Sequence, residues 1–108
     1  MARKTLDRKV KQAVLQYIQA LKDDHLPLKE VFVFGSRAKG TAHRDSDIDV
    51  AVISPQLKSA AWSTKYLLKK AHALRDTQFT IEPHAFHPST FVDENPLVWE
   101  IKKDGIPL

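Results

Sequence analysis

The sequence predicts a small α/β domain of the α+β kind, in which a mixed β-sheet is covered by helices on one face. Segments with apolar residues at helical spacing alternate along the chain with short runs of β-branched and aromatic residues. Turn-forming residues separate these segments from one another. The chain has 108 residues, which suits one hydrophobic core, so we expect a single domain over residues 1–108.

The first helix and the first strand are expected before the only Gly-Ser pair. Apolar residues recur at every third or fourth position from Thr5, the expected N-cap, to about Asp23. Pro27 then breaks the helical pattern. The run Glu30 to Phe34 is β-branched and aromatic and stops at Gly35, so it predicts a strand.

The next segment is polar and rich in turn residues. Ser36 is expected to start a short helix, and Gly40 supplies backbone freedom at its end. The run Asp47 to Ile53 predicts the second strand. Because side chains alternate along a strand, Asp47 and Asp49 are expected on the same face.

A helix and a third strand follow. The helix is expected to begin at Pro55 or Ser59 and to end near Leu74. The run Phe79 to Phe86 predicts the strand, and Pro83 within it indicates that one side of this strand lacks a full hydrogen-bond ladder.

A closing helix is expected from Pro96 to Lys103, with Pro in its first turn and Gly105 just past its end. Most of its apolar side chains are expected in the core, and any that remain exposed offer a docking surface for another protein. They are Leu97, Val98, Trp99 and Ile101.

Composition excludes several classes of protein. No apolar run approaches the roughly 18 residues needed to cross a bilayer, and the start of the chain lacks a signal-peptide pattern, so a cytoplasmic protein without membrane contact is expected. The chain has no cysteine, which excludes disulfides, thiolate zinc sites and cysteine nucleophiles. The net charge is +4, but the basic residues are spread along the chain, so we expect solvated helix faces rather than a nucleic-acid site.

A phosphate site is expected where the first strand ends. A strand that ends in Gly35-Ser36 and turns into a helix directs backbone N–H groups toward one point, and the Ser36 hydroxyl adds a donor. Arg37 and Lys39 are candidates for neutralising the charge of a triphosphate, although solvated positions would suit both equally well.

Carboxylates on the following strands predict a metal site. Asp47 and Asp49 are close enough to hold a pair of hard cations, and two such ions about 3.5–4 Å apart stabilise the attacking and leaving oxygens of a phosphoryl displacement. Glu82 is the best candidate for a third carboxylate, acting as metal ligand and acceptor-side base, although another acid stays open. Asp45 is interpreted as a turn residue.

Two other motifs are set aside. The segment from Gly35 to Gly40 fits G-x-x-x-x-G, but a P-loop continues with Lys and then Ser or Thr, whereas this chain continues with Thr41-Ala42. His84 and His87 form His-x-x-His, but no cysteine or well-spaced third ligand supports a zinc site. His84 can still approach the predicted site from the Glu82 face.

These motifs resemble a known family. The run GSRAKG at residues 35–40, followed by SDIDV at residues 46–50, is similar to the motif of the DNA polymerase beta nucleotidyltransferase superfamily. The short chain resembles the minimal nucleotidyltransferase (MNT) branch. The resemblance extends more weakly through Ile81 to Pro83 and the tail NPLVWEIKKDGI, and so covers residues 30–108.

The resemblance implies the nucleotidyltransferase fold and a role for each motif residue. Gly35 and Ser36 would hold the phosphates, Asp47 and Asp49 would bind two Mg²⁺ ions or Mn²⁺ in their place, and Glu82 would be the third carboxylate. The implied reaction moves AMP from ATP to an acceptor hydroxyl. Members of the MNT branch often pair with a small helical HEPN protein, and some are antitoxins that adenylylate it.

Two functions stay open for the sequence. In the first, the chain is an enzyme whose acceptor is a partner protein; in the second, it is a non-catalytic nucleotide-binding or antitoxin-like module that neutralises a HEPN partner by contact. Clustered acids repel one another without metal, which favours the enzyme. A small-molecule acceptor is disfavoured because no further domain is visible to bind it. Homo-oligomerisation, the acceptor and the preferred base stay undetermined.

Overall fold

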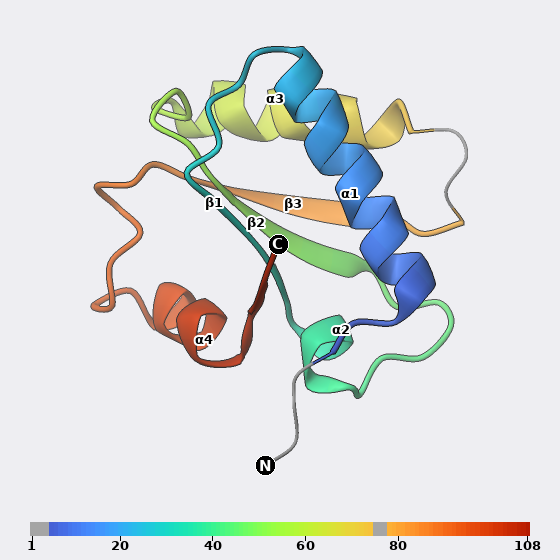
Figure 1. Ribbon diagram of the computed structural model, residues 1–108. Helices are drawn as coiled ribbons and strands as arrows, with labels where there is room; N and C mark the ends of the chain where they lie inside the picture. Colours follow the sequence, from blue (N-terminus) through green and yellow to red (C-terminus); the bar gives the residue numbers. More distant parts are fainter. Residues whose placement is uncertain (1–4, 75–77) are drawn as a thin grey trace.

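Four helices and four strands make up residues 5–74 and 78–108, the part of the chain that the computed structural model describes (Figure 1). In chain order they are α1 (Arg8–Asp23), β1 (Glu30–Phe34), α2 (Ser36–Lys39), β2 (Ile48–Ile53), α3 (Ala60–His72), β3 (Ile81–Phe86), α4 (Pro96–Asp104) and β4 (Ile106–Pro107).

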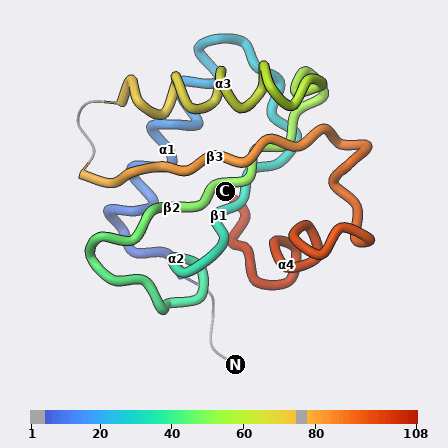
Figure 2. Tube along the Cα trace, turned by 180° about the vertical axis from the view of Figure 1, so that it is seen from behind, coloured from blue at the N-terminus to red at the C-terminus, as the bar shows by residue number. Residues whose placement is uncertain are grey.

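The strands form one mixed sheet in the order β3-β2-β1-β4, which confirms the predicted α/β class. Figure 2 shows the central strands side by side. Strand β1 is antiparallel to β2 and β4, while β2 and β3 are parallel. Asp49 pairs in register with Phe34 on one side and with Glu82 on the other, so β2 is the strand that joins the predicted motifs. Pro83 lies on the edge strand β3, where a missing N–H costs no ladder bond, as its position in the sequence predicted.

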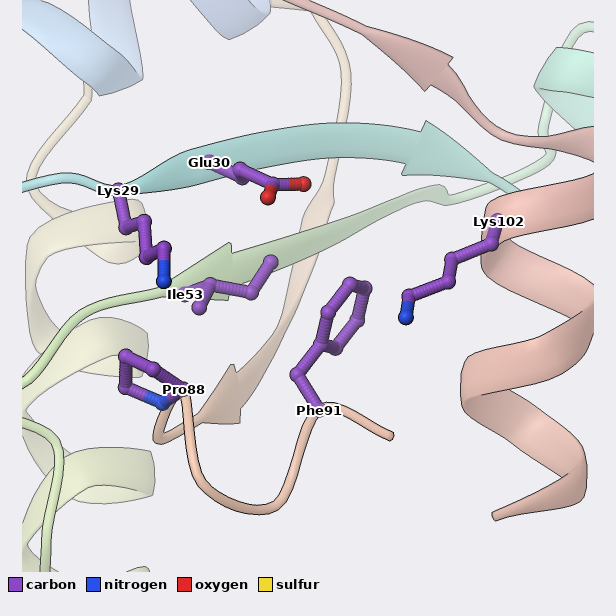
Figure 3. Close-up of a pocket in the computed structure, with 6 residues that line it drawn as sticks. All are labelled: Lys29, Glu30, Ile53, Pro88, Phe91 and Lys102. Atoms are coloured by element: carbon purple, nitrogen blue, oxygen red, sulfur yellow. The ribbon is translucent and has the colours of Figure 1, made fainter. Parts of the chain in front are cut away.

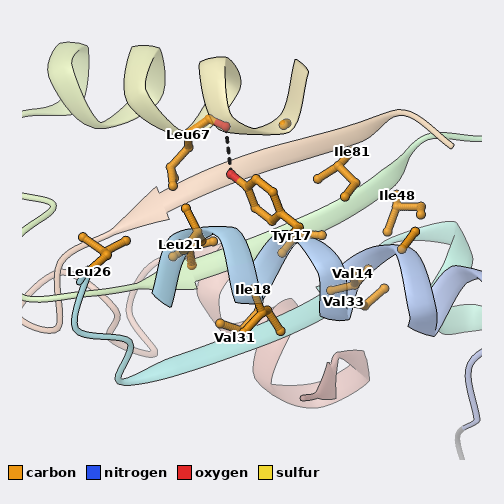
Figure 4. Close-up of a cluster of buried hydrophobic side chains, with 14 of the residues drawn as sticks. Val14, Tyr17, Ile18, Leu21, Leu26, Val31, Val33, Ile48, Leu67 and Ile81 are labelled. Atoms are coloured by element: carbon orange, nitrogen blue, oxygen red, sulfur yellow. Dashed lines mark hydrogen bonds between the residues drawn. The ribbon is translucent and has the colours of Figure 1, made fainter. Parts of the chain in front are cut away.

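Helices α1 and α3 cover one face of the sheet and enclose the larger core (Figure 1). Apolar side chains of α1 at helical spacing pack on alternate residues of β1 and β2. Within the described part of the chain, no helix is long and apolar enough to cross a membrane. Figure 4 shows the centre of this core, whose fully buried members include Val14, Tyr17, Leu21, Val33, Ile48, Val50 and Leu67.

The opposite face carries a second, smaller cluster, which the sequence analysis did not expect. Helix α4 packs there through Val98 and Ile101 against Phe34 and Ile53 of the central strands, and Phe91 joins them. Side chains alternate along β1, so Phe32 and Phe34 point away from the larger core. These aromatic residues provide the surface on which α4 packs. The prediction of helices on one face therefore holds for α1 and α3, and α4 adds cover on the other.

Capping residues determine where the helices begin. The Asp7 carboxylate accepts hydrogen bonds from the N–H groups of Lys9 at 2.9 Å and Val10 at 3.4 Å, so α1 begins at Arg8 and the predicted N-cap at Thr5 is wrong. Ser59 caps α3 by accepting from the Trp62 N–H, which decides between the two predicted starting points.

The strands are shorter than predicted at their beginnings. Strand β2 starts at Ile48, whose N–H donates to the Thr80 carbonyl, so Asp47 lies one residue before the ladder. Strand β3 starts at Ile81 rather than Phe79. Strand β4 has no signal in the sequence, because two residues are too few to form a periodic pattern.

Tyr17 provides a test of the larger core. Its ring is fully buried and its hydroxyl donates a 2.8 Å hydrogen bond to the Leu67 carbonyl of α3 (Figure 4). Burial raises the pKa of this hydroxyl, so it stays a neutral donor. We expect Tyr17→Phe to lower the free energy of unfolding by about 1 kcal/mol, as measured by urea denaturation, because the bond is lost without a cavity.

Tyr66→Phe is the matched control. The Tyr66 hydroxyl donates to Asp24 at the surface, where water replaces the lost bond, so a smaller loss is expected. Equal losses in the two variants would contradict the role given to the buried bond.

Candidate functional site

A tight approach between Gly35 and Asp49 forms the centre of the candidate site. Gly35 ends β1 with φ 72° and ψ −151°, a region that only glycine adopts readily. A Cβ at this position would stand 2.4 Å from Asp49 Oδ2, which is closer than non-bonded atoms can approach. The missing side chain therefore leaves the space that the Asp49 carboxylate occupies.

The short helix α2 begins immediately after this turn. The N–H groups of Ala38 and Lys39 donate to the Gly35 carbonyl, each at 3.1 Å. The N–H groups of Ser36 and Arg37 precede these first helical bonds, at the point where a helix leaves its donors unsatisfied. The left-handed Gly40 ends the helix, so the chain reverses within one turn.

Asp49, Glu82 and His84 form a cluster beside the turn. Each of the three offers a ligand atom, and these atoms all lie within 4.8 Å of one another. Asp49 and Glu82 meet because they are register partners on the parallel strands β2 and β3. His84 Nε2 lies 3.4 Å from Asp49 Oδ1, and its ring packs edge-on against Phe34 with centroids 4.9 Å apart. Two carboxylates and one imidazole are a donor set that fits a divalent cation.

Asp47 lies apart from this cluster. It is exposed on the loop before β2, where it lines a shallow hollow of about 140 Å³ with Asp45 and Thr80. Among the described acids and histidines, the group within 4.8 Å does not include Asp47. The structure thus brings together two of the three predicted carboxylates, and the role of Asp47 stays a prediction.

Arg37 holds the loop that carries Asp47. Its Nη2 donates to the Ser46 carbonyl at 2.8 Å and to the Arg44 carbonyl at 3.4 Å, and its guanidinium lies over the Phe79 ring at 5.2 Å. Arg37 Nε is buried and has no hydrogen-bond partner among the residues that the structure describes. The sequence motif predicted a phosphate contact here, and the structure places the side chain where it orders the loop.

Lys39 connects α2 to α4. Its Nζ lies 2.7 Å from Glu100 Oε1, and both side chains are more than two-fifths exposed. The hydrogen bond and the charge of Glu100 raise the pKa of Lys39. The predicted contact between Lys39 and a triphosphate would require this ion pair to open or to be shared.

Another hollow, of about 210 Å³, lies at the opposite end of the sheet, where β1 begins and β2 ends (Figure 3). Lys29 and Lys102 stand at its sides, and Phe91 lines it between them. Lys102 is already paired with Asp93 at 2.7 Å. This hollow contains none of the motif residues.

The structure confirms that His84 approaches the acids from the Glu82 face, whereas the contacts of Arg37 were not expected from the sequence. His84 carried a signal, because it alternates with Glu82 on the same strand and so shares its face. Arg37 carried none beyond its place in the motif, because contacts with loop carbonyls depend on the path of the loop.

Comparison with known proteins points to one family. A family model described as a nucleotidyltransferase domain matches residues 14–104. A segment of 37 residues is 46% identical to the protein adenylyltransferase MntA of Shewanella oneidensis. That segment covers 34% of this chain and 27% of the relative.

Solved structures support the same fold. One is a toxin-antitoxin with AMP-PNP, which has a TM-score of 0.60 and 21% identity over 94% of this chain and 72% of its own. A mutant of the toxin-antitoxin MntA-HpeT has a TM-score of 0.58 and 21% identity, covering 86% of this chain and 69% of its own.

The contact between Gly35 and Asp49 can be tested by a double-mutant cycle. We expect Gly35→Ala to lower the free energy of unfolding by more than about 2 kcal/mol, because the new Cβ meets Asp49 Oδ2 and the backbone conformation is strained. In an Asp49→Ala background only the strain remains, so the cost of Gly35→Ala should fall markedly. Urea denaturation of the four proteins measures both values.

Gly40→Ala is the control for a positive φ alone. An added Cβ there would meet no described atom within 4 Å, so a cost of about 1 kcal/mol is expected, independent of residue 49. If Gly35→Ala cost the same with and without the Asp49 carboxylate, the close approach would be refuted.

Proposed function

Because this chain belongs to the nucleotidyltransferase domain family, we propose that it transfers AMP from ATP to a hydroxyl of a partner protein, as an antitoxin-type adenylyltransferase. The observation that carries the proposal is the meeting of Asp49 and Glu82 beside the Gly35 turn. Support comes from the adenylyltransferase MntA, with which a segment of the chain shares 46% identity. Two of the similar solved folds are described as toxin-antitoxin structures, one of them with AMP-PNP.

The triphosphate would bind at the turn between β1 and α2. The N–H groups of Ser36 and Arg37 and the Ser36 hydroxyl are donors there, and Gly35 allows a close approach to the backbone. Lys39 would add positive charge at the end of α2 if its ammonium group contacted the phosphates as well as Glu100. These donors would hold the phosphates beside the acid cluster.

The donor set of the cluster fits divalent metal ions. Asp49 and Glu82 would hold one ion through their carboxylate oxygens. Asp47, on the loop before β2, would provide a further carboxylate ligand for a second ion. Bound ions would neutralise the phosphates and stabilise the charge that develops on the oxygens around phosphorus.

The side chains of the protein position the reactants and move the proton. The acceptor oxygen forms a bond to the α-phosphorus, the bond to the bridging oxygen breaks, and pyrophosphate leaves. The exposed Glu82 carboxylate would accept the proton of the acceptor hydroxyl. Such positioning provides a large share of the rate in phosphoryl transfer, where the protein performs little covalent chemistry.

The acceptor hydroxyl would come from a partner, for which a small helical HEPN protein is the candidate. The hollow beside Asp47 measures about 140 Å³, which is below the roughly 300 Å³ of a small-molecule pocket. On α4, Val98 and Ile101 are buried but Trp99 is 52% exposed and Leu97 37% exposed. Both side chains are available for docking, on different sides of the helix about 200° apart, and Glu100, which pairs with Lys39, lies between them.

Transfer of label from ATP tests the proposal. With α-³²P-ATP and a small helical HEPN protein as the candidate partner, we expect label on that protein, and with γ-³²P-ATP we expect none. Asp49→Asn should reduce transfer by at least about 100-fold, because it removes charge at the cluster without removing packed volume. The fold should persist, as measured by circular dichroism.

Asp45→Asn is the control, because Asp45 is an exposed carboxylate on the same loop outside the cluster. It should transfer label at nearly the wild-type rate. Undiminished transfer by Asp49→Asn would refute the site. A wild-type chain that binds ATP and its partner but transfers no label would instead be a non-catalytic module.

A further inference from the structure

His84 gives the acid cluster a nitrogen ligand in addition to its carboxylates. It lies on β3 two residues beyond Glu82 and on the same face, and its register partner Ala51 follows Asp49 on β2 in the same way. Asp49, Ala51, Glu82 and His84 thus form two neighbouring register pairs on the parallel strands β2 and β3. The small Ala51 side chain is fully buried. The imidazole therefore reaches back toward the carboxylates.

Packing holds the ring in this orientation. The edge-on contact with Phe34, whose centroid is 4.9 Å away, supports the imidazole from the side of β1. The Nε2 atom faces Asp49 Oδ1 at 3.4 Å, which is longer than the 2.7–3.2 Å of a strong hydrogen bond. Nε2 is thus directed at the space between the carboxylates without being tightly bound to one of them.

The chemistry of this donor set differs from that of an all-carboxylate site. Mg²⁺ prefers oxygen ligands in near-ideal octahedral geometry. An imidazole nitrogen raises the affinity for first-row transition ions relative to Mg²⁺. We propose that His84 Nε2 joins Asp49 and Glu82 as a metal ligand, so that this site holds Mn²⁺ or another first-row transition ion in preference to Mg²⁺. The proposal rests on the proposed function, because it assigns the ion class of the same cluster.

His87 offers a matched control on the same segment. Its Nδ1 lies 2.7 Å from Ser89 Oγ and accepts from the Ser89 N–H at 3.1 Å, so it is bonded within its own loop. It does not belong to the described group of ligand atoms within 4.8 Å. A change at His87 alters the histidine content without altering the cluster.

Metal binding to the purified protein tests the ligand. Mn²⁺ is titrated into the wild type, His84→Gln and His87→Gln, with free Mn²⁺ measured by electron paramagnetic resonance. Mg²⁺ affinity is measured by displacement of Mn²⁺. We expect His84→Gln to weaken Mn²⁺ binding about tenfold or more, similar to the loss of affinity when groups around other metal sites are mutated. The affinity for Mg²⁺ should change much less. His87→Gln should match the wild type.

A spectroscopic measurement separates a ligand from a positioning residue. Electron spin-echo modulation of bound Mn²⁺ should show coupling to a ¹⁴N nucleus in the wild type and in His87→Gln, and none in His84→Gln. Absence of ¹⁴N coupling in the wild type would overturn the proposal, and so would equal losses of Mn²⁺ and Mg²⁺ affinity in His84→Gln. Either result would leave the transferase proposal intact, because that proposal is tested separately, by the transfer of label and by its dependence on Asp49.

Discussion

The close approach of the Asp49 carboxylate to the Gly35 backbone is the constraint on which the rest of the site depends. It requires a residue without a side chain at the end of β1, and it requires β1 and β2 to be antiparallel neighbours in one register. The same register places Glu82 beside Asp49 through the parallel pairing of β2 and β3. Three segments distant in the sequence therefore meet at one point: the turn from β1 into α2, the Asp49 end of β2 and the Glu82 end of β3.

The two faces of the sheet have different roles in the molecule. One face is closed by α1 and α3 and contains the larger core, which makes the strands rigid supports. The other face carries the acid cluster at one end and the packing of α4 at the other. Because α4 covers only part of this face, the carboxylates stay accessible, and Lys39 and Glu100 link the covering helix to the turn. A partner that contacts α4 would thus be close to the reacting groups.

The sequence predicted those features that depend on local pattern. Residue patterns identified the three main strands, alternation put Glu82 and His84 on one face of their strand, and the Gly-Ser pair located the turn. The sequence did not predict the features that depend on contacts between distant segments. The ladder bond from Ile48 to Thr80 decides where β2 begins, and it leaves Asp47 on a loop. Likewise, the aromatic residues of β1 draw α4 to the second face, and no periodicity within α4 indicates that choice.

A crystal structure with Mn²⁺ and an ATP analogue whose α–β bridging atom is carbon tests the central claim most directly. We predict an anomalous manganese signal bounded by Asp49 and Glu82, with the triphosphate on the N–H groups of Ser36 and Arg37. A triphosphate bound in the hollow between Lys29 and Lys102, at the opposite end of the sheet, would contradict the account.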